Sequence, residues 1–515
     1  MAFNSVQFLL FFPIVFCCYF FCTLVIKKNI VTQTVLLIFS LFFYACWEPA
    51  YLCLILISVV ITYFSGIYME KFQTHKGLIL TVSLVSNLAI LFFFKYYNFF
   101  ADSLNWYFVS AKSDARIPGL NILLPVGISF YTFQALGYSI DVYKGKVRAE
   151  TNFITYALFV TFFPQLVAGP IERTGNLLPQ FKIEHSLDYD RITSGLKLAA
   201  WGFFEKVVIA DRLAVYVNGI YNNLEIATGW SLLLATFLFS FQVLCDFSGY
   251  SDIAIGVARI LGFDLMRNFR RPFFAKSVGE TWARWHISLS TWFKDYLYFP
   301  LGGSRVSKFR HCFNLLVVMA VSGFWHGAAW HYVLWGVMHG IFQSVGILTT
   351  PVRRKVLVAC KLGSFDNSIK GGLRVKRGWQ FVQMFITFCL FIFAAVVFRA
   401  NTMADYGVIM QKMSHIPAEL ANALSSVHAA GAIEAFRNLF VLDESISGYG
   451  IKHCAAALGC IAVLLSADLI TRRERGYDII KRQHFLIRWI CYYLLVFAIL
   501  FCSVTGKTAF VYFQF

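Results

Sequence analysis

Charged residues are scarce in this sequence of 515 residues: they make up 14% of the chain, whereas 58% of the residues are hydrophobic and 18% are aromatic. Soluble globular chains carry about 25% charged residues. The composition therefore excludes a water-soluble multidomain enzyme. It also excludes a disordered chain, because disorder requires low hydrophobicity. We expect an all-α polytopic membrane protein.

Several signatures of known chemistry are missing. The sequence has no CxxC pair, no HExxH, no GxSxG and no glycine-rich loop ending in GK[ST]. These absences argue against a zinc ribbon, a serine hydrolase and a P-loop ATPase. Most of the 13 cysteines lie in apolar runs, where cysteine behaves as a small hydrophobe. His326, His331 and His339 lack a metal-ligand spacing, so we expect no metal and no bound cofactor.

Acidic residues are also few, 27 against 45 lysines and arginines, which gives a net charge of +18. On a soluble protein this excess suggests nucleic acid. In a membrane protein it is better explained by basic loops beside the anionic cytoplasmic leaflet. The first positive charges, Lys27 and Lys28, follow the first apolar stretch. A cleavable signal peptide has them before it, so we expect a retained membrane helix.

A membrane-spanning helix needs about 20 mostly apolar residues. Two shorter apolar stretches, 152–168 and 312–324, are interrupted or loosened by proline and glycine, and we expect re-entrant or broken helices there. No internal repeat or low-complexity segment stands out. About eleven runs are long enough to span: 6–26, 30–47, 50–68, 78–97, 121–140, 193–219, 230–258, 328–348, 379–398, 452–470 and 485–505.

The charges of the loops predict an orientation. Loop 349–378 carries eight basic residues and one acid, and loop 471–484 carries five basic residues and two acids. Segment 399–451 carries three basic residues and five acids. Basic loops stay in the cytoplasm, so the first two loops and segment 264–311 are predicted inside and 399–451 outside. Successive loops alternate correctly between the two sides of the membrane only if segments 152–168 and 312–348 do not each cross the membrane once.

The densest polar and aromatic cluster runs from Cys245 to His339. Asp246 and Asp252 lie within an apolar helix, where carboxylates are costly and are candidates for function. The alternative is that they cap a broken helix or satisfy backbone groups. The segment around Arg284, Trp285 and His286 is typical of an interfacial helix, although an anchor does not require an imidazole.

A second histidine, His326, lies between Gly323 and Gly327 in an apolar stretch. A lone membrane histidine is often a buried, hydrogen-bonded residue. The flanking glycines favour a catalytic role, because they let the backbone approach a substrate closely. At these residues the resemblance to a known family becomes specific.

The sequence resembles a membrane-bound O-acyltransferase (MBOAT) of the bacterial alginate-O-acetylation type. The motifs that carry the resemblance follow in order along nearly the whole chain. They are Leu124–Gln134 (LPVGISFYTFQ), Ile140–Tyr143 (IDVY), Gly169–Ile171 (GPI), Asp246–Asp252 (DFSGYSD), Arg284–Ser288 (RWHIS), Phe299–Gly303 (FPLGG), Trp325–Gly327 (WHG), Phe398–Ala400 (FRA) and Tyr512–Phe515 (YFQF).

The resemblance implies an active-site histidine at His326, a second family histidine at His286, and a bundle of about 11 transmembrane helices with re-entrant and interfacial helices around a central funnel. It also implies a cytoplasmic acyl donor and an acceptor outside. We expect one acyltransferase domain over 1–515 in a cell (inner or plasma) membrane. Its predicted parts are N-terminal helices in 1–120, a catalytic core in 121–348, and C-terminal helices in 379–515 with the outside loop 399–451.

A thioester such as acetyl-CoA is already activated, so transfer to a hydroxyl needs a base rather than a protein nucleophile. We predict His326 as that base or as the acyl and proton shuttle, and His286 as a positioning group nearer the cytoplasm. Arg284 and Lys294 are candidates to attract the anionic donor, with a plain membrane anchor as the alternative. The candidate substrate-binding residues are Trp325, Arg284, Trp285, Asp246 and Asp252.

The expected acceptor is alginate, another exopolysaccharide, peptidoglycan, cellulose or a secreted relay acetyltransferase that docks on segment 399–451. Within the family, D-alanyl transfer to teichoic acid is an alternative, although those proteins are usually shorter. A lipid or glycan transporter would bind its substrate at broken helices, but it lacks the expected internal repeat. A non-catalytic scaffold is a third possibility.

Overall fold

The computed structural model describes residues 1–167, 169–365, 373–471 and 476–504. Within these ranges the chain is helical except for one short antiparallel ribbon, β1 (Gly363–Phe365) and β2 (Leu373–Val375). Two compact units share the chain: one comprises Met1–Phe203 and Gly249–Arg267, the other Phe204–Ser248 and Asn268–Phe515. The long helix α12 (Gly229–Ile260) contributes to both. The single domain over 1–515 and its three parts stay a prediction.

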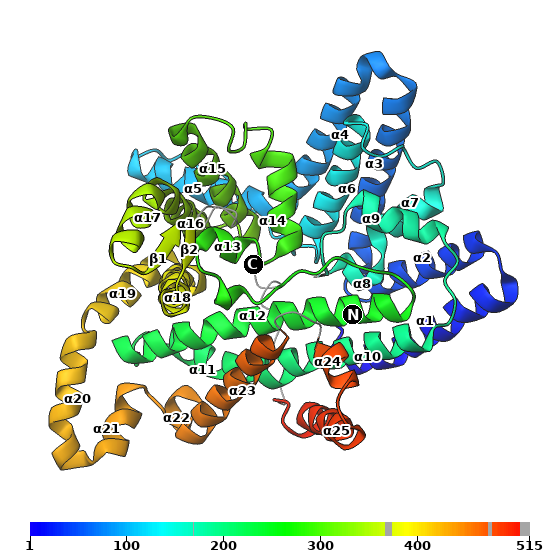
Figure 1. The fold of residues 1–515 in the computed structure, drawn as a ribbon. Helices are drawn as coiled ribbons and strands as arrows, with labels where there is room; N and C mark the ends of the chain where they lie inside the picture. Colours follow the sequence, from blue (N-terminus) through cyan, green and yellow to red (C-terminus); the bar gives the residue numbers. More distant parts are fainter. Residues whose placement is uncertain (168, 366–372, 472–475, 505–515) are drawn as a thin grey trace. The chain divides into compact units, whose positions relative to one another are not determined.

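The N-terminal unit consists of helices packed in sequence order together with the second part of α12. In this unit α3, α4 and α6 lie side by side (Figure 1). Its elements are α1 (Val6–Phe21), η1 (Cys22–Ile26), α2 (Asn29–Ala45), η2 (Pro49–Tyr51), α3 (Leu52–Lys71), η3 (Gln73–His75), α4 (Lys76–Leu91), η4 (Phe92–Tyr96), α5 (Tyr97–Ser110), α6 (Ile128–Tyr143), α7 (Phe153–Thr161), α8 (Phe163–Leu166), α9 (Thr174–Leu177), η5 (Leu178–Lys182) and α10 (Tyr189–Phe203).

Small and polar residues hold these apolar helices together. A Cβ on Gly66 would lie 2.5 Å from the Tyr138 hydroxyl, and one on Gly195 would lie 2.7 Å from the Gly256 carbonyl oxygen. The Ser58 hydroxyl donates to Asn87 Oδ1 over 2.5 Å between α3 and α4. Close backbone approach and interhelical hydrogen bonds are how helices associate in lipid, where apolar burial provides little driving force.

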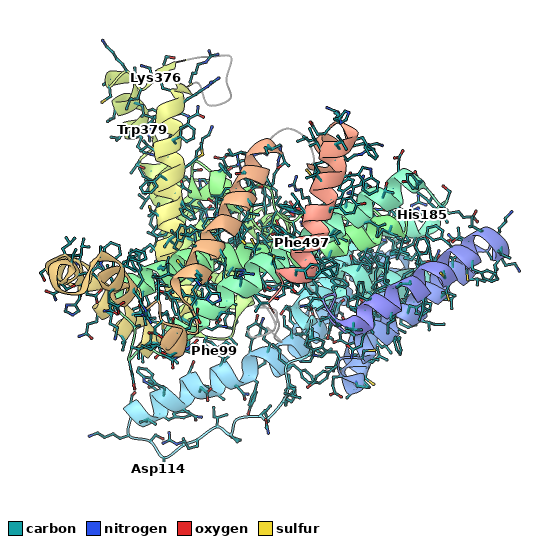
Figure 2. The ribbon with its side chains drawn as sticks, turned by 90° about the horizontal axis from the view of Figure 1, so that it is seen from below. Phe99, Asp114, His185, Lys376, Trp379 and Phe497 are labelled. Carbon is teal, nitrogen blue, oxygen red and sulfur yellow. The ribbon has the colours of Figure 1, made fainter. Side chains whose placement is uncertain are left out.

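Two irregular segments of the N-terminal unit are fixed by side chains. The expected break in 152–168 is present: α7 ends at Thr161, Phe162 is extended with ψ 111°, and α8 starts at Phe163. The chain after α5 folds back along it, since the Asn105 amide donates to the Ile117 carbonyl over 2.9 Å. Figure 2 labels Phe99 on α5 and Asp114 on this returning segment.

The second unit contains the glycine-flanked histidine. Its elements are η6 (Phe204–Ala210), α11 (Asp211–Tyr221), the first part of α12, η7 (Pro272–Phe274), α13 (Val278–Trp282), α14 (Ile287–Phe293), η8 (Lys294–Tyr298), α15 (Lys308–His326), α16 (Trp330–Leu348), α17 (Thr350–Ala359), β1, β2, α18 (Arg377–Arg399), α19 (Met403–Ser414), α20 (Ile416–Ala430), α21 (Ala432–Leu439), α22 (Glu444–Ser447), α23 (Ile451–Ile470), α24 (Gly476–Lys481) and α25 (Phe485–Phe501).

Ten of the eleven apolar runs coincide with a helix or a series of helices, and in 121–140 the helix α6 begins only at Ile128. The chain is therefore an all-α, multi-pass membrane protein. In the described ranges, six helices are long and apolar enough to cross a membrane, or seven if the bent pair α16 and α17 is one span. Helices α2 and α25 are apolar but shorter. The count of about 11 spans therefore stays a prediction.

The expectation of a broken helix in 312–324 is wrong, because α15 runs without interruption from Lys308 to His326, while the expectation of a re-entrant segment stays a prediction. Gly323 does not loosen α15, since it faces Tyr332 of α16. The interfacial interpretation of segment 282–292 also needs correction: Trp282, Trp285 and Trp292 are all buried. Their indole rings therefore pack inside the protein and do not lie at a membrane surface.

The ends of α18 have the character predicted for an inside-to-outside helix. Figure 2 labels Lys376 and Trp379 at its first end, a combination typical of a membrane interface. Its other end leads into α19 to α22, a series of short helices (Figure 1). Residues 472–475 (three arginines and Glu474), Asp366, Lys370 and the closing Tyr512–Phe515 motif lie outside the described residues.

Candidate active site

Helices α15 and α16 form a tight hairpin that positions His326. His326 is the last residue of α15, and Gly327 breaks the helix with extended backbone, φ −165° and ψ 147°. A Cβ on Gly327 would lie 2.2 Å from the Tyr332 ring, and one on Gly323 would lie 2.1 Å from the Tyr332 carbonyl oxygen. Both glycines are thus required for the contact with Tyr332. The expectation that they admit a substrate is replaced by this packing role.

An aromatic cage surrounds the His326 imidazole, which is 2% exposed. Its ring centroid lies 5.1 Å from that of Trp325, 5.2 Å from that of Trp335 and 5.8 Å from that of Phe398. These residues come from α15, α16 and α18. The cage excludes water from the imidazole, and a dry environment strengthens every electrostatic interaction inside it.

The structure brings the second family histidine into the same cage. The rings of His286 and His326 are 6.4 Å apart, and His286 is fully buried. His286 has left-handed backbone, φ 44° and ψ 54°, a conformation that is uncommon for a residue with a Cβ and often marks a functional site. It is held there by flanking backbone bonds from Arg270 N to Arg284 O and from Ile287 N to Asn268 O, both 2.8 Å.

A hydrogen-bond network fixes the tautomer of His286. Its Nδ1 lies 3.1 Å from Asn268 Oδ1, which also accepts from the Ser288 amide at 3.2 Å and the Ser288 hydroxyl at 2.9 Å. Because a backbone amide only donates, the atom facing these groups is the Asn268 oxygen, and Nδ1 must carry the proton. The lone pair of the neutral ring is then on Nε2.

Burial lowers the pKa of His286 well below its usual range, and the neighbouring His326 lowers it further. Phe247, Phe269 and Trp325 cover the rest of the ring, with centroids 4.6 to 6.5 Å away. His286 is therefore neutral at physiological pH. A neutral imidazole can accept a proton from a hydroxyl group, which is what a general base requires.

Three other predicted site residues surround this pair. Trp325 contacts both histidines, whereas Trp285 packs on Phe269 and Phe391 with centroid distances of 5.3 and 5.1 Å. Arg284 forms an ion pair with Glu280 and donates to the Arg271 carbonyl over 3.3 Å. The guanidinium that was expected to attract the donor is thus already bound by a carboxylate.

The two predicted carboxylates belong to different units. Asp246 is buried, and its Oδ1 lies 2.5 Å from the Lys206 ammonium, which also lies 2.7 Å from Asp211 Oδ1. Asp252 is half-buried and belongs to the N-terminal unit. Asp246 therefore pairs with a buried cation, which is a structural role other than the helix cap or backbone partner considered from the sequence.

Sequence reasoning missed Asn268 and Trp335. Asn268 lies 18 residues before His286, and nothing in its neighbourhood marks it. Trp335 could have been noticed in the sequence, because it lies between His331 and His339 on the second helix of the hairpin. Within the ranges that the structure describes, no three histidine, cysteine or acidic side chains come together as metal ligands.

The fold and the cage define a polytopic helical membrane protein with a buried pair of histidines. Residues 145–359 match the profile of the membrane-bound O-acyltransferase family. A peptidoglycan O-acetyltransferase of Helicobacter pylori is 31% identical over 100% of this chain and 98% of its own. The "Probable alginate O-acetylase AlgI" of Pseudomonas putida is 37% identical over 78% of both chains. A teichoic acid D-alanyltransferase of Streptococcus thermophilus is 27% identical over 56% of this chain and 74% of its own.

The chain belongs to the membrane-bound O-acyltransferase family. The resemblance to the alginate-O-acetylation type is confirmed, and the protein is an O-acyltransferase.

Proposed function

We propose that this enzyme moves an acetyl group from a cytoplasmic thioester to a hydroxyl group outside the membrane, with His326 as the general base. The observation that supports it is the pairing of His326 with a tautomer-fixed His286, rings 6.4 Å apart, inside an aromatic cage. Relatives named for O-acetylation of peptidoglycan and alginate support the acetyl group.

The proposed reaction needs no bound cofactor, with acetyl-CoA or another acyl thioester as the donor substrate. The base accepts the proton of the acceptor hydroxyl, whose oxygen attacks the thioester carbonyl. The carbon–sulfur bond then breaks, and the leaving thiolate takes up a proton. His286 positions His326 and the reacting groups, while Trp325 and the other cage rings exclude water that would hydrolyse the thioester.

The proposed acceptor is a polysaccharide of the cell envelope or a secreted relay acetyltransferase, and the proposed location is the inner or plasma membrane. Segment 399–451 supports a docking role through its exposed face on α20 to α22, where Leu424, Ile433 and Ile446 are exposed. Glu434 and Asp443 both pair with Arg437, and Asp443 also caps α22. Glu444 lies 3.4 Å from His453 Nδ1 and is the most exposed of these three carboxylates, so we choose Glu444→Lys as the charge reversal.

The test is thioester consumption by the purified protein in sealed liposomes. With acetyl-CoA on the side of loop 349–378, thiol release should require an acceptor on the opposite side. Addition of a secreted acetyltransferase should accelerate the transfer, and Glu444→Lys should weaken that acceleration without changing donor hydrolysis. Thiol release with a D-alanyl carrier thioester but not with acetyl-CoA would favour teichoic acid D-alanylation, and no release with either would reject the proposal.

The orientation is tested by labelling, in a background without the 13 native cysteines. Single cysteines placed in 353–365 or 373–377 should resist an impermeant thiol reagent applied from outside, whereas those in 405–445 should react. The predicted contrast follows from the charge of the loops. The opposite pattern would reverse the side from which the donor arrives.

A further inference from the structure

A second group of buried polar atoms lies beside the histidine cage, on α13 and α16. The atoms are Trp282 Nε1, both ring nitrogens of His339, and Gln343 Nε2. Each is buried, and none has a hydrogen-bond partner among the residues that the structure describes. Buried polar groups are almost always hydrogen-bonded, because an unmade bond destabilises the fold. Four such atoms in one place therefore need an explanation.

The three side chains converge from facing helices. The rings of Trp282 and His339 are 5.2 Å apart and perpendicular. Gln343 lies one turn after His339 on α16, so the two share a face. Its Oε1 would lie 3.9 Å from a Cβ on Gly279 of α13. Trp282, His339 and Gln343 thus line the same α13–α16 contact, and we name them the amide subsite.

Trp335 connects the amide subsite to the histidine cage. Its ring lies 5.2 Å from that of His326, 5.0 Å from that of His339 and 5.4 Å from that of Trp282. Along α16 the order is Trp335, His339, Gln343, and the helix then leads to α17 with its basic residues Arg353, Arg354 and Lys355. The amide subsite is therefore between His326 and the predicted cytoplasmic side.

We propose that the amide subsite hydrogen-bonds the amide-bearing arm of the thioester donor. The inference rests on the proposed function, because it assigns the donor to this side of His326. An indole N–H and a carboxamide NH2 donate, and a neutral imidazole donates at one nitrogen and accepts at the other. A pantetheine arm, with two amides spaced along a flexible chain, presents the matching carbonyl oxygens and N–H groups. A hydrocarbon chain presents neither.

The test compares two acetyl thioesters, S-acetylpantetheine, which has both amides, and S-acetyl-2-mercaptoethanol, which has none. The measured quantity is the preference, the ratio of their kcat/KM values. His339→Phe and Gln343→Leu should each reduce the preference about tenfold, the equivalent of one hydrogen bond, mainly through the KM of S-acetylpantetheine. His339→Gln, which keeps a donor and an acceptor, should restore most of it.

His331→Phe is the matched control, because His331 is also buried on α16 but contacts Tyr332, at a centroid distance of 4.1 Å. It should leave the preference unchanged. A uniform loss on both thioesters in the His339 and Gln343 variants, or no loss, would overturn the amide subsite and indicate a packing role or ordered water. If His339→Phe cannot be produced as folded protein, the preference of His339→Gln and Gln343→Leu decides whether the amide subsite is accepted.

Binding of free pantetheine, which carries no acyl group, separates the two proposals. Binding that weakens about tenfold in Gln343→Leu, in a protein that transfers no acetyl group, would reject the proposed function and support the amide subsite. Acetyl transfer by a protein whose pantetheine binding does not depend on His339 or Gln343 would leave the function intact and reject the amide subsite.

Discussion

The second unit buries two polar clusters, and the structure treats them differently. In the histidine cage, His286 is neutral, and aromatic rings enclose both His286 and His326. In the other cluster, Lys206 pairs with Asp246 and Asp211 at 2.5 and 2.7 Å. The first cluster contains a neutral imidazole, and the second contains one lysine paired with two carboxylates.

The difference shows how a buried polar group can be interpreted. A buried ion pair restrains its partners, because removing either charge leaves the other uncompensated. A buried neutral imidazole keeps a lone pair that can take a proton during a reaction. We therefore assign the Lys206 cluster to stability and the histidine cage to chemistry.

The largest expected effect is on the Lys206 cluster. Lys206→Met leaves Asp246 and Asp211 buried without this counter-charge, and it should lower the free energy of unfolding by about 3–5 kcal/mol. Thermal unfolding in detergent measures it. The matched control is the triple variant Lys206→Met, Asp211→Asn, Asp246→Asn, which should regain most of the loss. If Lys206→Met kept its full stability but lost acyl transfer, the assignment of the Lys206 cluster to stability would be wrong.

A smaller effect is expected at Asn268. Asn268→Leu removes the acceptor that fixes the His286 tautomer, so His286 can present the wrong nitrogen to the reaction. We expect kcat to fall about 10–100-fold, equivalent to about 1.4–2.7 kcal/mol of transition-state stabilisation. Steady-state thiol release measures it, and Asn268→Asp, which still accepts from Nδ1, should retain more activity. Equal activity of Asn268→Leu and the unchanged protein would remove His286 from the mechanism.

The smallest effect concerns the pH dependence of stability. His286 has a lowered pKa in the fold, because it is buried and because the His326 ring lies 6.4 Å away. In the unfolded chain the His286 imidazole binds a proton below about pH 6.5. The contribution of neutral His286 to the free energy of unfolding is therefore present above that pH and is lost as the pH falls. The expected loss attributable to His286 is about 1 kcal/mol between pH 6.5 and 5.5.

Unfolding midpoints at the two pH values measure this loss. His286→Asn is the matched variant, because asparagine tolerates left-handed backbone and does not titrate. It should show a shallower decline than the unchanged protein over the same interval. Parallel declines would mean that His286 is not held neutral.

Much of the fold could be predicted from apolar runs, because all but one of the runs long enough to span coincide with a helix or a series of helices. His326 and His286 could be proposed because an imidazole is unexpected in an apolar stretch or in a membrane anchor. Their arrangement could not be predicted. The Asn268 contact depends on backbone pairing between residues 268–270 and 284–287, and such pairing leaves no periodic pattern in the sequence.

Asp246 and Gly327 show the same limit. Whether Asp246 is reactive or structural depends on Lys206, which is 40 positions earlier in the chain. Gly327 permits either a substrate or a side chain to approach, and only the position of the Tyr332 ring decides between them. A sequence indicates which residues are unusual, but their partners decide what they do.

The central claim is that His326 removes the acceptor proton. The most direct measurement is thiol release from acetyl-CoA by purified His326→Gln, beside His331→Gln as a matched change of a buried histidine five residues later. His326→Gln, like His326→Ala, should lose about 10²–10⁴-fold in kcat with an unchanged unfolding midpoint, while His331→Gln retains its activity. Wild-type turnover by a folded His326→Gln protein would contradict the claim.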